Sequence, residues 1–375
     1  MDARLKETST TPESCCGSVD HPTVMPAKPQ TFVVGAIKTA IGEVPLISAS
    51  LTAADRWGGI KARWKIGRMN YIVQPGLYAI GAPDKNSPAL VTANYKMSFD
   101  ILRRELSGRS AWIMVLDTRG INVWCAAGKG TFGTLELLNR TESCGLSQVI
   151  KHRTLILPQL GAVGVAAHQV RSLSGFRVVY GPVRAKDLPA FLDNGMKATA
   201  KMREKTFSTG ERIVLIPVEL VPVLAKSLII LPAFFLVGGL IGPGPFLTAA
   251  LTHGIMAAWA VLCTILAGAV LTPALLPWLP GRAFSLKGLL AGLLAAAALV
   301  AFTWPDAATP SQRFEILSWV LMISAGAAFL AMNFTGASTF TSLSGVRKEM
   351  RWAVPMEIAA VVAGLGLWAG SLLLA

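Results

Sequence analysis

The sequence is short of charged residues. Asp, Glu, Lys and Arg make up 15% of its 375 residues, whereas an average soluble domain has about 25%. Hydrophobic residues reach 53%. The composition therefore excludes an ordinary soluble domain for the whole chain, and it indicates that part of the chain is built for a lipid environment.

Cysteines are also few, and none of them is spaced as Cys-x-x-Cys. The five stand at positions 15, 16, 125, 144 and 263. Iron–sulfur and zinc frameworks use closely spaced cysteines, so we expect no iron–sulfur cluster in this chain. The first 30 residues are polar and lack the apolar core of a signal peptide. With the odd cysteine count, this predicts a reducing compartment.

The charge that is present is unevenly distributed. Residues 213–375 contain seven of the 35 Lys and Arg residues and five of the 21 Asp and Glu residues. The remaining 28 basic and 16 acidic residues give residues 1–212 a net charge of +12. No nucleic-acid motif accompanies this charge, so we expect no nucleic-acid partner. An anionic membrane leaflet is the expected counterpart, and an acidic protein is the alternative.

Three regions follow from these patterns. Residues 1–44 are expected to form a disordered N-terminal tail. Residues 45–212 alternate strand-like and helix-like segments, which is typical of an α/β domain with a largely parallel sheet. Residues 213–375 predict an all-α transmembrane domain of five helices. Its spans are expected near 221–241, 247–270, 286–304, 314–334 and 352–374.

The loops between these spans predict their orientation. Lys and Arg are concentrated in the second and fourth loops, at Arg282, Lys287, Arg347, Lys348 and Arg351. Because cytoplasmic loops carry an excess of Lys and Arg, these loops and the α/β domain should be inside the cell. We therefore expect a multi-pass protein of the cytoplasmic membrane with its C-terminus outside.

The most informative stretch is Asn-Val-Trp-Cys-Ala-Ala-Gly-Lys-Gly-Thr-Phe at residues 122–132. It predicts a strand that ends at Cys125, small residues that let a flat ligand approach the backbone, and a helix over 128–139. A helix N-terminus stabilises a nearby thiolate. A thiolate is a soft, electron-rich ligand for a transition metal, so Cys125 is the candidate metal ligand.

Three other interpretations of this stretch compete. Gly128, Gly130 and Gly133 have the spacing of a dinucleotide fingerprint, but the acidic residue expected about 20 positions later is missing. A phosphate loop would need Gly in place of Val123 and Ser or Thr in place of Gly130. A buried cysteine packed beside Trp124 is the plainest alternative, and the residue chemistry alone leaves it open.

Residues 122–132 resemble the signature of the mercury-methylating corrinoid protein family, HgcA. This resemblance covers roughly residues 45–375. Residues 88–100, Pro-Ala-Leu-Val-Thr-Ala-Asn-Tyr-Lys-Met-Ser-Phe-Asp, also resemble the corrinoid-binding domain of the corrinoid iron–sulfur protein large subunit. The resemblance implies a Rossmann-like α/β corrinoid-binding domain with a cap helix, followed by the five transmembrane helices.

The resemblance also implies a cofactor and a site. A cobalamin-type corrinoid in its base-off form would bind with Cys125 as the lower axial ligand of cobalt. None of the four histidines lies in Asp-x-His-x-x-Gly, the frame that would place histidine on cobalt. The cofactor-binding cap would consist of Asn122, Val123, Trp124, Cys125, Ala126, Ala127, Gly128, Lys129 and Phe132. Because strand ends converge at one sheet edge, the upper corrin face should be lined by Thr92, Asn94, Gln159 and Gly161.

The activity implied by the family is corrinoid-dependent methyl transfer from Co(III) to Hg(II), which gives methylmercury. A thiolate opposite the methyl group would push electron density onto cobalt and favour an electrophilic acceptor. A ferredoxin-like protein with two 4Fe–4S clusters is the expected reductant, and the methyl donor is expected to be folate- or pterin-linked. The alternative is a membrane-bound methyl carrier of one-carbon metabolism, of the acetyl-CoA pathway type. A transporter is less favoured, because the spans show no internal repeat.

Overall fold

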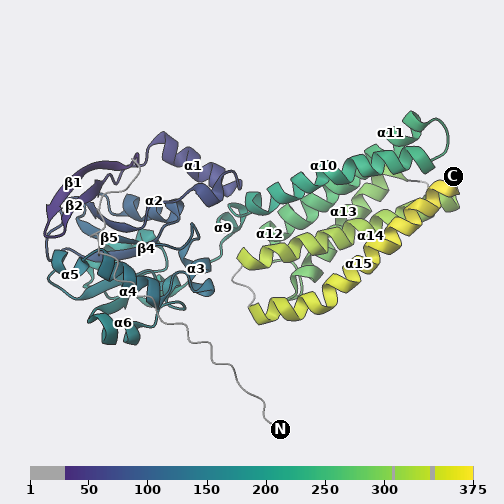
Figure 1. The fold of residues 1–375 in the computed structure, drawn as a ribbon. Helices are drawn as coiled ribbons and strands as arrows, with labels where there is room; N and C mark the ends of the chain where they lie inside the picture. Colours follow the sequence, from purple (N-terminus) through teal and green to yellow (C-terminus); the bar gives the residue numbers. More distant parts are fainter. Residues whose placement is uncertain (1–29, 306–308, 338–342, 375) are drawn as a thin grey trace, which may run out of the picture. The chain divides into compact units, whose positions relative to one another are not determined.

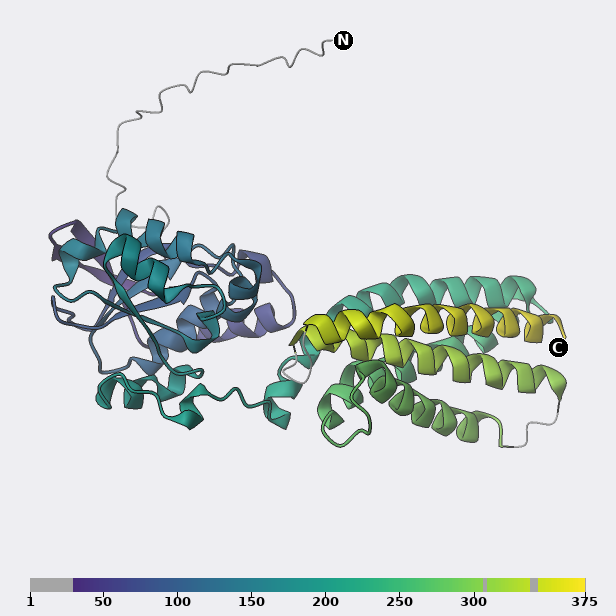
Figure 2. The same cartoon turned by 90° about the horizontal axis from the view of Figure 1, so that it is seen from below.

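The computed structural model describes residues 30–305, 309–337 and 343–374. The chain divides into two compact units. One unit contains the residues up to Leu51 together with Ile72–Met202, and the other contains Thr52–Tyr71 together with Arg203–Ala375. The first is an α/β unit and the second is helical (Figures 1 and 2).

The α/β unit is built on one sheet with the strand order β1-β2-β3-β5-β4-β6-β7. Its strands are β1 (Val33–Thr39), β2 (Gly42–Ile47), β3 (Gly76–Ile80), β4 (Ala89–Ala93), β5 (Ala111–Leu116), β6 (Thr154–Leu157) and β7 (Arg177–Tyr180). Strand β4 pairs in parallel with β5 and β6, and β6 pairs in parallel with β7. The β1–β2 and β3–β5 pairs are antiparallel, and β2–β3 is parallel. The sheet is therefore mixed but mainly parallel.

The strand order reverses at β4. The chain passes from β4 through a helix to β5 on one side of it, and then crosses to β6 on the other side. Such a reversal opens a crevice beyond the carboxyl ends of the strands, which is where ligands of α/β sheets lie. The connecting elements are α2 (Lys96–Glu105), α3 (Val123–Lys129), α4 (Thr134–Ser143), α5 (Leu146–Val149), η2 (Gln159–Gly161), α6 (Ala167–Ser174), η3 (Ala185–Asp187), α7 (Leu188–Asp193) and α8 (Ala200–Arg203).

Helices cover both faces of the sheet. Alternate residues of β5 point to opposite faces, as the pleat of a strand requires. Ile113 belongs to a core cluster with Phe99 of α2 and Phe191 of α7. Its neighbour Met114 belongs to a second cluster with Leu137 of α4. Because both faces are covered, β5 is apolar and buried along its whole length.

The α/β unit begins earlier than the sequence predicted. A disordered tail over residues 1–44 is wrong for residues 33–44, which form β1 and the first half of β2. The two strands pair antiparallel, with a shift of register between Val33 and Gly35. Strand β1 is a sheet edge with mostly exposed side chains. Residues 32–37 are nevertheless an apolar run, Phe-Val-Val-Gly-Ala-Ile, so the sequence does carry a strand signal and the predicted boundary was placed too late. Residues 1–29 lie outside the described part of the chain.

The other boundary expected from the sequence, an α/β domain over 45–212, also needs correction. Residues 52–71 form α1 (Ala53–Arg63) and η1 (Arg68–Asn70), and they cluster with the helical unit. Residues 203–212 do the same, and they include most of α9 (Thr209–Ile213). Neither segment carries the long apolar run that identifies a span, so sequence patterns gave no reason to separate them from the α/β domain.

The helical unit confirms the expected set of five long apolar helices. Within the described residues, five helices are long and apolar enough to cross a membrane. They are built from α10 (Ile216–Ile241), α11 (Phe246–Ile265) with η4 (Leu266–Leu271) and α12 (Thr272–Leu275), α13 (Phe284–Thr303), α14 (Pro310–Asn333), and α15 (Leu343–Leu373), with η5 (Phe334–Ala337) after α14. An α/β unit followed by five such helices is the fold class that the sequence predicted.

Small residues bring α13 and α14 into close contact. A Cβ atom added to Gly288 would lie 2.5 Å from the carbonyl oxygen of Ala327. A Cβ atom added to Gly292 would lie 2.8 Å from the Cα atom of Ser324. Helices in lipid associate through such close backbone approach, because the hydrophobic effect does not drive apolar helices together there. The packing of this unit is therefore of the kind found in membrane proteins.

The corrected start of the α/β unit can be tested by substitution. The ring of Phe32 is 3% exposed, and its centroid lies 5.0 Å from that of Phe99 and 6.2 Å from that of Tyr78. Phe32→Ala should lower the free energy of unfolding by about 3–5 kcal/mol. Val34→Ala, at a position that is 63% exposed, should cost less than about 0.5 kcal/mol. Pulse proteolysis of the α/β unit in urea, on the full chain in detergent, measures both. Equal small effects would contradict a folded β1.

Candidate functional site

A cavity of about 310 Å³ lies in the α/β unit where the strand order reverses. Its walls come from the end of β4, from α2, from the start of α3, and from the segments that follow β6 and β7. The lining residues are Leu90, Val91, Thr92, Ser98, Ile101, Leu102, Asn122, Val123, Trp124, Ile156, Leu157, Pro158, Leu160, Gly181, Pro182, Val183, Ala185 and Leu188. The cavity thus occupies the position at which this class of sheet binds its ligands.

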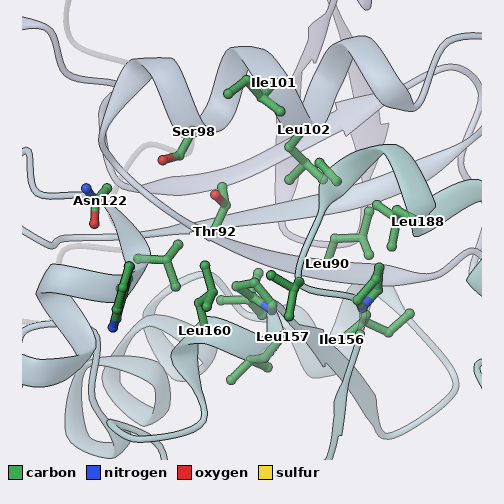
Figure 3. A pocket seen from close by; sticks show the side chains of 18 residues that line it. Leu90, Thr92, Ser98, Ile101, Leu102, Asn122, Ile156, Leu157, Leu160 and Leu188 are labelled. Atoms are coloured by element: carbon green, nitrogen blue, oxygen red, sulfur yellow. The ribbon is translucent and has the colours of Figure 1, made fainter. Parts of the chain in front are cut away.

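The lining is mainly apolar. Figure 3 shows apolar side chains such as Leu90, Leu157 and Leu160 around the cavity, and the polar residues that it labels are Thr92, Ser98 and Asn122. An apolar wall with a few polar groups is the usual composition of a small-molecule or cofactor site, in which the polar groups fix the orientation of the ligand.

The loop between β5 and α3 is held by the buried side chain of Asn94. The Asn94 Oδ1 atom accepts hydrogen bonds from the backbone N–H of Thr118 (3.1 Å), the Thr118 hydroxyl (2.8 Å) and the N–H of Gly120 (2.9 Å). Its Nδ2 atom donates to Asp117 at 3.1 Å. Asn94 is 3% exposed and Thr118 is fully buried. One amide therefore fixes the course of the chain just before α3.

Helix α3 starts where Asn122 caps it. The Asn122 side-chain oxygen accepts a hydrogen bond from the backbone N–H of Cys125 at 2.9 Å. Asn is a favoured N-cap residue because this bond satisfies an N–H that has no partner within the helix. At the other end, Gly130 has a φ of 81° and closes the helix as a left-handed C-cap.

The secondary structure expected for this stretch was therefore wrong in detail. Cys125 does not end a strand, because Val123–Lys129 is helix α3. The helix expected over 128–139 is interrupted at Gly130 and resumes as α4 at Thr134. The sequence Val-Trp-Cys is apolar enough to resemble a buried strand, and a short apolar run does not distinguish a strand from a buried helical turn.

One face of α3 is exposed and carries the candidate ligand. Cys125 is exposed, the indole of Trp124 is 38% exposed, and Gly128 is exposed one helical turn after Trp124. This excludes the plain alternative of a buried cysteine packed beside Trp124. Cys125 itself is not among the residues that line the cavity, whereas Asn122, Val123 and Trp124 are.

The other face of α3 is fixed to the core. Ala126 is fully buried and Ala127 is 4% exposed. A Cβ atom on Gly164 would lie 3.0 Å from the Cα atom of Ala127 and would clash with the carbonyl oxygen of Phe132. A Cβ atom on Gly161 would lie 2.6 Å from the ring of Phe132. Small residues on both sides thus let the segment after β6 pack directly against α3 and hold it in place.

The residues predicted from the sequence take different places in this site. Four of them line the cavity, namely Thr92, Asn122, Val123 and Trp124. Three more are exposed on α3, namely Cys125, Gly128 and Lys129. Four are buried in packing contacts, namely Ala126, Ala127, Phe132 and Gly161. Asn94 holds the loop before α3, and Gln159 lies in η2 outside the cavity lining.

Sequence reasoning missed most of the cavity wall. The missed residues include Ser98, Ile101, Leu102 and Pro158. The apolar ones resemble ordinary core residues, and their sequence carries no signal of a cavity. Leu160, Gly181 and Pro182 lie at the ends of the strands expected from the sequence, so the rule that ligands lie beyond strand ends did point to them.

A mainly parallel α/β sheet with a cavity at its point of reversal defines a ligand-binding domain. Sequence comparison makes this class more specific. Residues 67–192 match the family described as the CO dehydrogenase/acetyl-CoA synthase delta subunit. This range runs from η1 to α7 and includes every element of the cavity wall.

Individual relatives agree with the family match. The acetyl-CoA decarbonylase/synthase complex subunit gamma of Methanopyrus kandleri is 32% identical over 123 residues, which are 32% of this chain and 26% of the relative. The same subunit of Methanocaldococcus jannaschii is 30% identical over 136 residues, 36% of this chain and 28% of the relative. The corrinoid/iron–sulfur protein large subunit of Moorella thermoacetica is 29% identical over 121 residues, 32% of this chain and 27% of the relative.

These relatives share only part of their length with the chain. The chain spans about a quarter of the length of the curated relatives it matches. The similarity supports a corrinoid-binding relationship for the α/β unit. It bears out the resemblance to the corrinoid iron–sulfur protein, whereas the finer resemblance to mercury-methylating proteins stays a prediction.

The role of Asn94 can be tested with a matched pair of substitutions. Asn94→Ala leaves the backbone N–H groups of Thr118 and Gly120 without their acceptor, while the Thr118 hydroxyl keeps the carbonyl oxygen of Ile121 at 2.6 Å. Each unsatisfied buried donor costs about 1–3 kcal/mol. We expect the free energy of unfolding to fall by about 2–4 kcal/mol and hydrogen exchange of residues 117–125 to accelerate. Asn86→Ala, at an exposed turn position, should change neither. Pulse proteolysis and exchange mass spectrometry measure the two effects, and unchanged exchange in the Asn94 variant would contradict this role.

Thiol alkylation tests the exposure of Cys125. Burial raises the pKa of Cys144 to about 11, above the ordinary value of about 8.5. Because the thiolate is the reactive form, Cys144 should resist iodoacetamide at pH 8 and react only as the pH approaches 11 or the chain unfolds. Cys125, which is exposed, should be alkylated at pH 8. Peptide mapping by mass spectrometry distinguishes the two sites, and equal labelling at pH 8 would contradict the structure.

Proposed function

We propose that this protein is a membrane-anchored corrinoid protein that accepts a methyl group and passes it on. The observation that carries the proposal is the exposed thiol of Cys125, held in the first turn of α3 beside the cavity at the strand-order reversal. The similarity of residues 67–192 to acetyl-CoA synthase and corrinoid/iron–sulfur subunits supports it.

The residues around Cys125 fit a corrinoid. A Cβ atom added to Gly128 would have no neighbour within 4 Å, so a broad flat ring has room to approach the backbone there. The half-exposed indole of Trp124 offers an apolar surface. The hydroxyls of Thr92 and Ser98 are available for the polar groups at the edge of such a ring. When bound, a corrinoid supplies a cobalt centre that can carry a methyl group.

Each residue of the site has a proposed task. Cys125 would ligate cobalt through Sγ as a thiolate, which is a soft and electron-rich ligand. Asn122 orients the turn that carries the sulfur, and Asn94 fixes the loop before it. The buried residues Ala126 and Ala127 of α3, together with Phe132 after it, fix the helix to the core. The apolar cavity wall would keep water from the part of a bound ligand that it covers.

One-carbon metabolism of the acetyl-CoA pathway type is the first candidate setting. The names of the relatives favour it, because they are subunits of acetyl-CoA decarbonylase/synthase complexes. In this setting the chain is a methyl carrier and its acceptor belongs to another protein. A ferredoxin-like protein with two 4Fe–4S clusters would supply electrons, and a folate- or pterin-linked compound would supply the methyl group.

A second candidate acceptor is Hg(II). The resemblance of residues 122–132 to the mercury-methylating signature, together with the exposure of Cys125 within it, favours this acceptor. Hg(II) is an electrophile, so it requires a methyl group with carbanion character. Electron donation by a cysteine thiolate acts in that direction. Mercury would be the substrate and methylmercury the product.

The five apolar helices are proposed to cross the cytoplasmic membrane with the α/β unit inside the cell. Lys and Arg are concentrated at the starts of α13 and α15, at Arg282, Lys287, Arg347, Lys348 and Arg351, and this supports the orientation. It would keep the thiol of Cys125 in a reducing compartment, where it stays free to bind a metal.

The test is anaerobic expression with cobalamin and the ferredoxin-like partner, followed by measurement of bound corrinoid, uptake of labelled methyl groups and methylmercury formed from Hg(II). Cys125→Ala should lower methyl transfer by more than about a hundredfold, since loss of even a supporting partner of a metal ligand costs ten- to hundredfold. Cys125→His should keep a ligand but lose the electron donation of sulfur. Cys263→Ala, within α11, is the matched control and should retain activity.

The outcomes separate the candidates. Methylmercury from the wild type, and none from Cys125→Ala, would support Hg(II) as the acceptor. Bound corrinoid and methyl uptake without methylmercury would leave the methyl carrier as the function. A wild-type chain that retains no corrinoid in cobalamin-replete cells would overturn the proposal as a whole.

A further inference from the structure

Residues 52–71, between β2 and β3, combine exposed apolar side chains with positive charge. The apolar side chains are Trp57, Ile60, Trp64, Ile66 and Met69, each at least 40% exposed. The basic residues are Arg56, Lys61, Arg63, Lys65 and Arg68, and the single acidic residue is Asp55. Most of this segment precedes residue 67, where the family match begins. The family match therefore covers only the last part of the segment.

The segment is well folded. Thr52 and Asp55 form a capping box at the start of α1, in which the Asp55 N–H donates to Thr52 Oγ1 (3.1 Å) and the Thr52 N–H donates to Asp55 Oδ2 (3.0 Å). The Tyr71 hydroxyl donates to the carbonyl oxygen of Asp55 at 3.0 Å. The Tyr71 ring lies against Gly58, where an added Cβ atom would be only 2.6 Å from it. The exposed side chains thus belong to a structured segment whose two ends contact each other through Tyr71 and α1.

The exposed apolar residues of α1, together with its C-cap residue Trp64, form a single stripe. At about 100° per residue, Trp57, Ile60 and Trp64 lie within roughly 60° of one another around the helix axis. The buried residues Asp55 and Ala62 lie on the opposite side. Arg56 and Arg63 flank the stripe on one edge, and Lys61 flanks it on the other. A helix with an outward apolar stripe between basic residues is typical of segments that lie in a membrane interface.

The segment also belongs to the basic end of the helical unit. It clusters with the five long helices, and Lys65 and Arg68 interact electrostatically with Glu219 in the first turn of α10. At the same end Arg212 donates to the carbonyl oxygen of Ala274 (3.1 Å) and lies 5.8 Å from the ring centroid of Trp278.

Exposed tryptophans mark this end further. Trp278 is 68% exposed and Trp352, in the early part of α15, is 45% exposed. A hydrogen bond from the Ser285 N–H to Glu349 joins the starts of α13 and α15 at this end. Tryptophan together with Lys and Arg characterises the boundary between a bilayer and the cytoplasm. The bundle end from which α10 begins therefore has the composition of such a boundary.

We propose that residues 52–71 are an interfacial membrane anchor that binds an anionic lipid surface. The Trp57, Ile60 and Trp64 stripe enters the headgroup region, and the flanking Arg and Lys residues contact anionic headgroups. The charge argues for lipid over an apolar protein partner, because Arg56, Lys61 and Arg63 flank the stripe and juxtamembrane basic residues are attracted to anionic leaflets. The anchor precedes the first span, so it gives the chain a second attachment to the membrane. This inference is independent of the proposed corrinoid chemistry.

Site-specific photo-crosslinking tests the anchor in the full chain. A benzophenone amino acid in place of Trp57 is irradiated in nanodiscs of zwitterionic phosphatidylcholine, with or without anionic phosphatidylglycerol, and lipid adducts are counted by mass spectrometry. The same amino acid in place of Leu135, which is 72% exposed on α4 of the α/β unit, is the matched control. We expect at least about tenfold more lipid adducts at Trp57 than at Leu135, and several-fold more with phosphatidylglycerol than without it.

A charge variant sharpens the test. Arg56→Gln, Lys61→Gln and Arg63→Gln combined leave the stripe and the capping box intact, and they should abolish the gain that phosphatidylglycerol gives. Adduct yields at Trp57 no higher than at Leu135 would overturn the anchor. Adducts to a second copy of the chain in place of lipid would overturn it in favour of a protein interface. The proposal would also be contradicted if the adduct yield at Trp57 changed neither with phosphatidylglycerol nor with the charge variant.

Discussion

The hydrogen bonds of Asn94 are the constraint on which the candidate site depends. A single buried amide at the end of β4 binds the backbone and hydroxyl of Thr118 and the backbone of Gly120. These residues lead directly to Asn122, which caps α3 and sets the turn that carries Cys125. An unpaired buried amide is costly, so the loop has one favourable course. The position of the thiol is therefore determined by the core of the sheet.

Helix α3 meets two requirements that conflict in most helices. A ligand residue must be accessible to its metal. Its side chain must also be held rigidly, because a loose side chain neither selects nor orients the metal. Here the inner face consists of small buried residues such as Ala126 and Ala127, pressed against the segment after β6 near Gly164. The outer face leaves Cys125 and Gly128 open. The short helix is thus fixed from one side and accessible from the other, which is what the proposed corrinoid site requires.

Much of the architecture could be predicted from the sequence because it depends on composition over long windows. The five apolar helices and the alternation of strands and helices are signals of this kind. The edge hairpin of β1 and β2 was missed although residues 32–37 are apolar, because the polar tail before them was extended to residue 44. The helical state of Val123–Cys125 was also missed, because it depends on the Asn122 cap, and the apolar run itself is equally compatible with a strand.

The candidate site also has parts that the sequence predicts and parts that it does not. The stretch around Cys125 stands out in the sequence because its unusual residues are contiguous. The role of Asn94 joins residues that are 24 and 26 positions apart, so no local pattern reveals it. Residues such as Leu102 and Ile101 line the cavity but have the composition of core. Only the tertiary fold distinguishes an apolar residue at a cavity wall from one that is packed on all sides.

The central claim is that Cys125 ligates the cobalt of a bound corrinoid. X-ray absorption at the cobalt edge tests it most directly, on the full chain purified anaerobically from cobalamin-replete cells. The account predicts one sulfur ligand on cobalt in the wild type, and its loss in Cys125→Ala while the Cys263→Ala control retains it. Cobalt bound without a sulfur ligand in the wild type, or a sulfur ligand that persists in Cys125→Ala, would contradict the account.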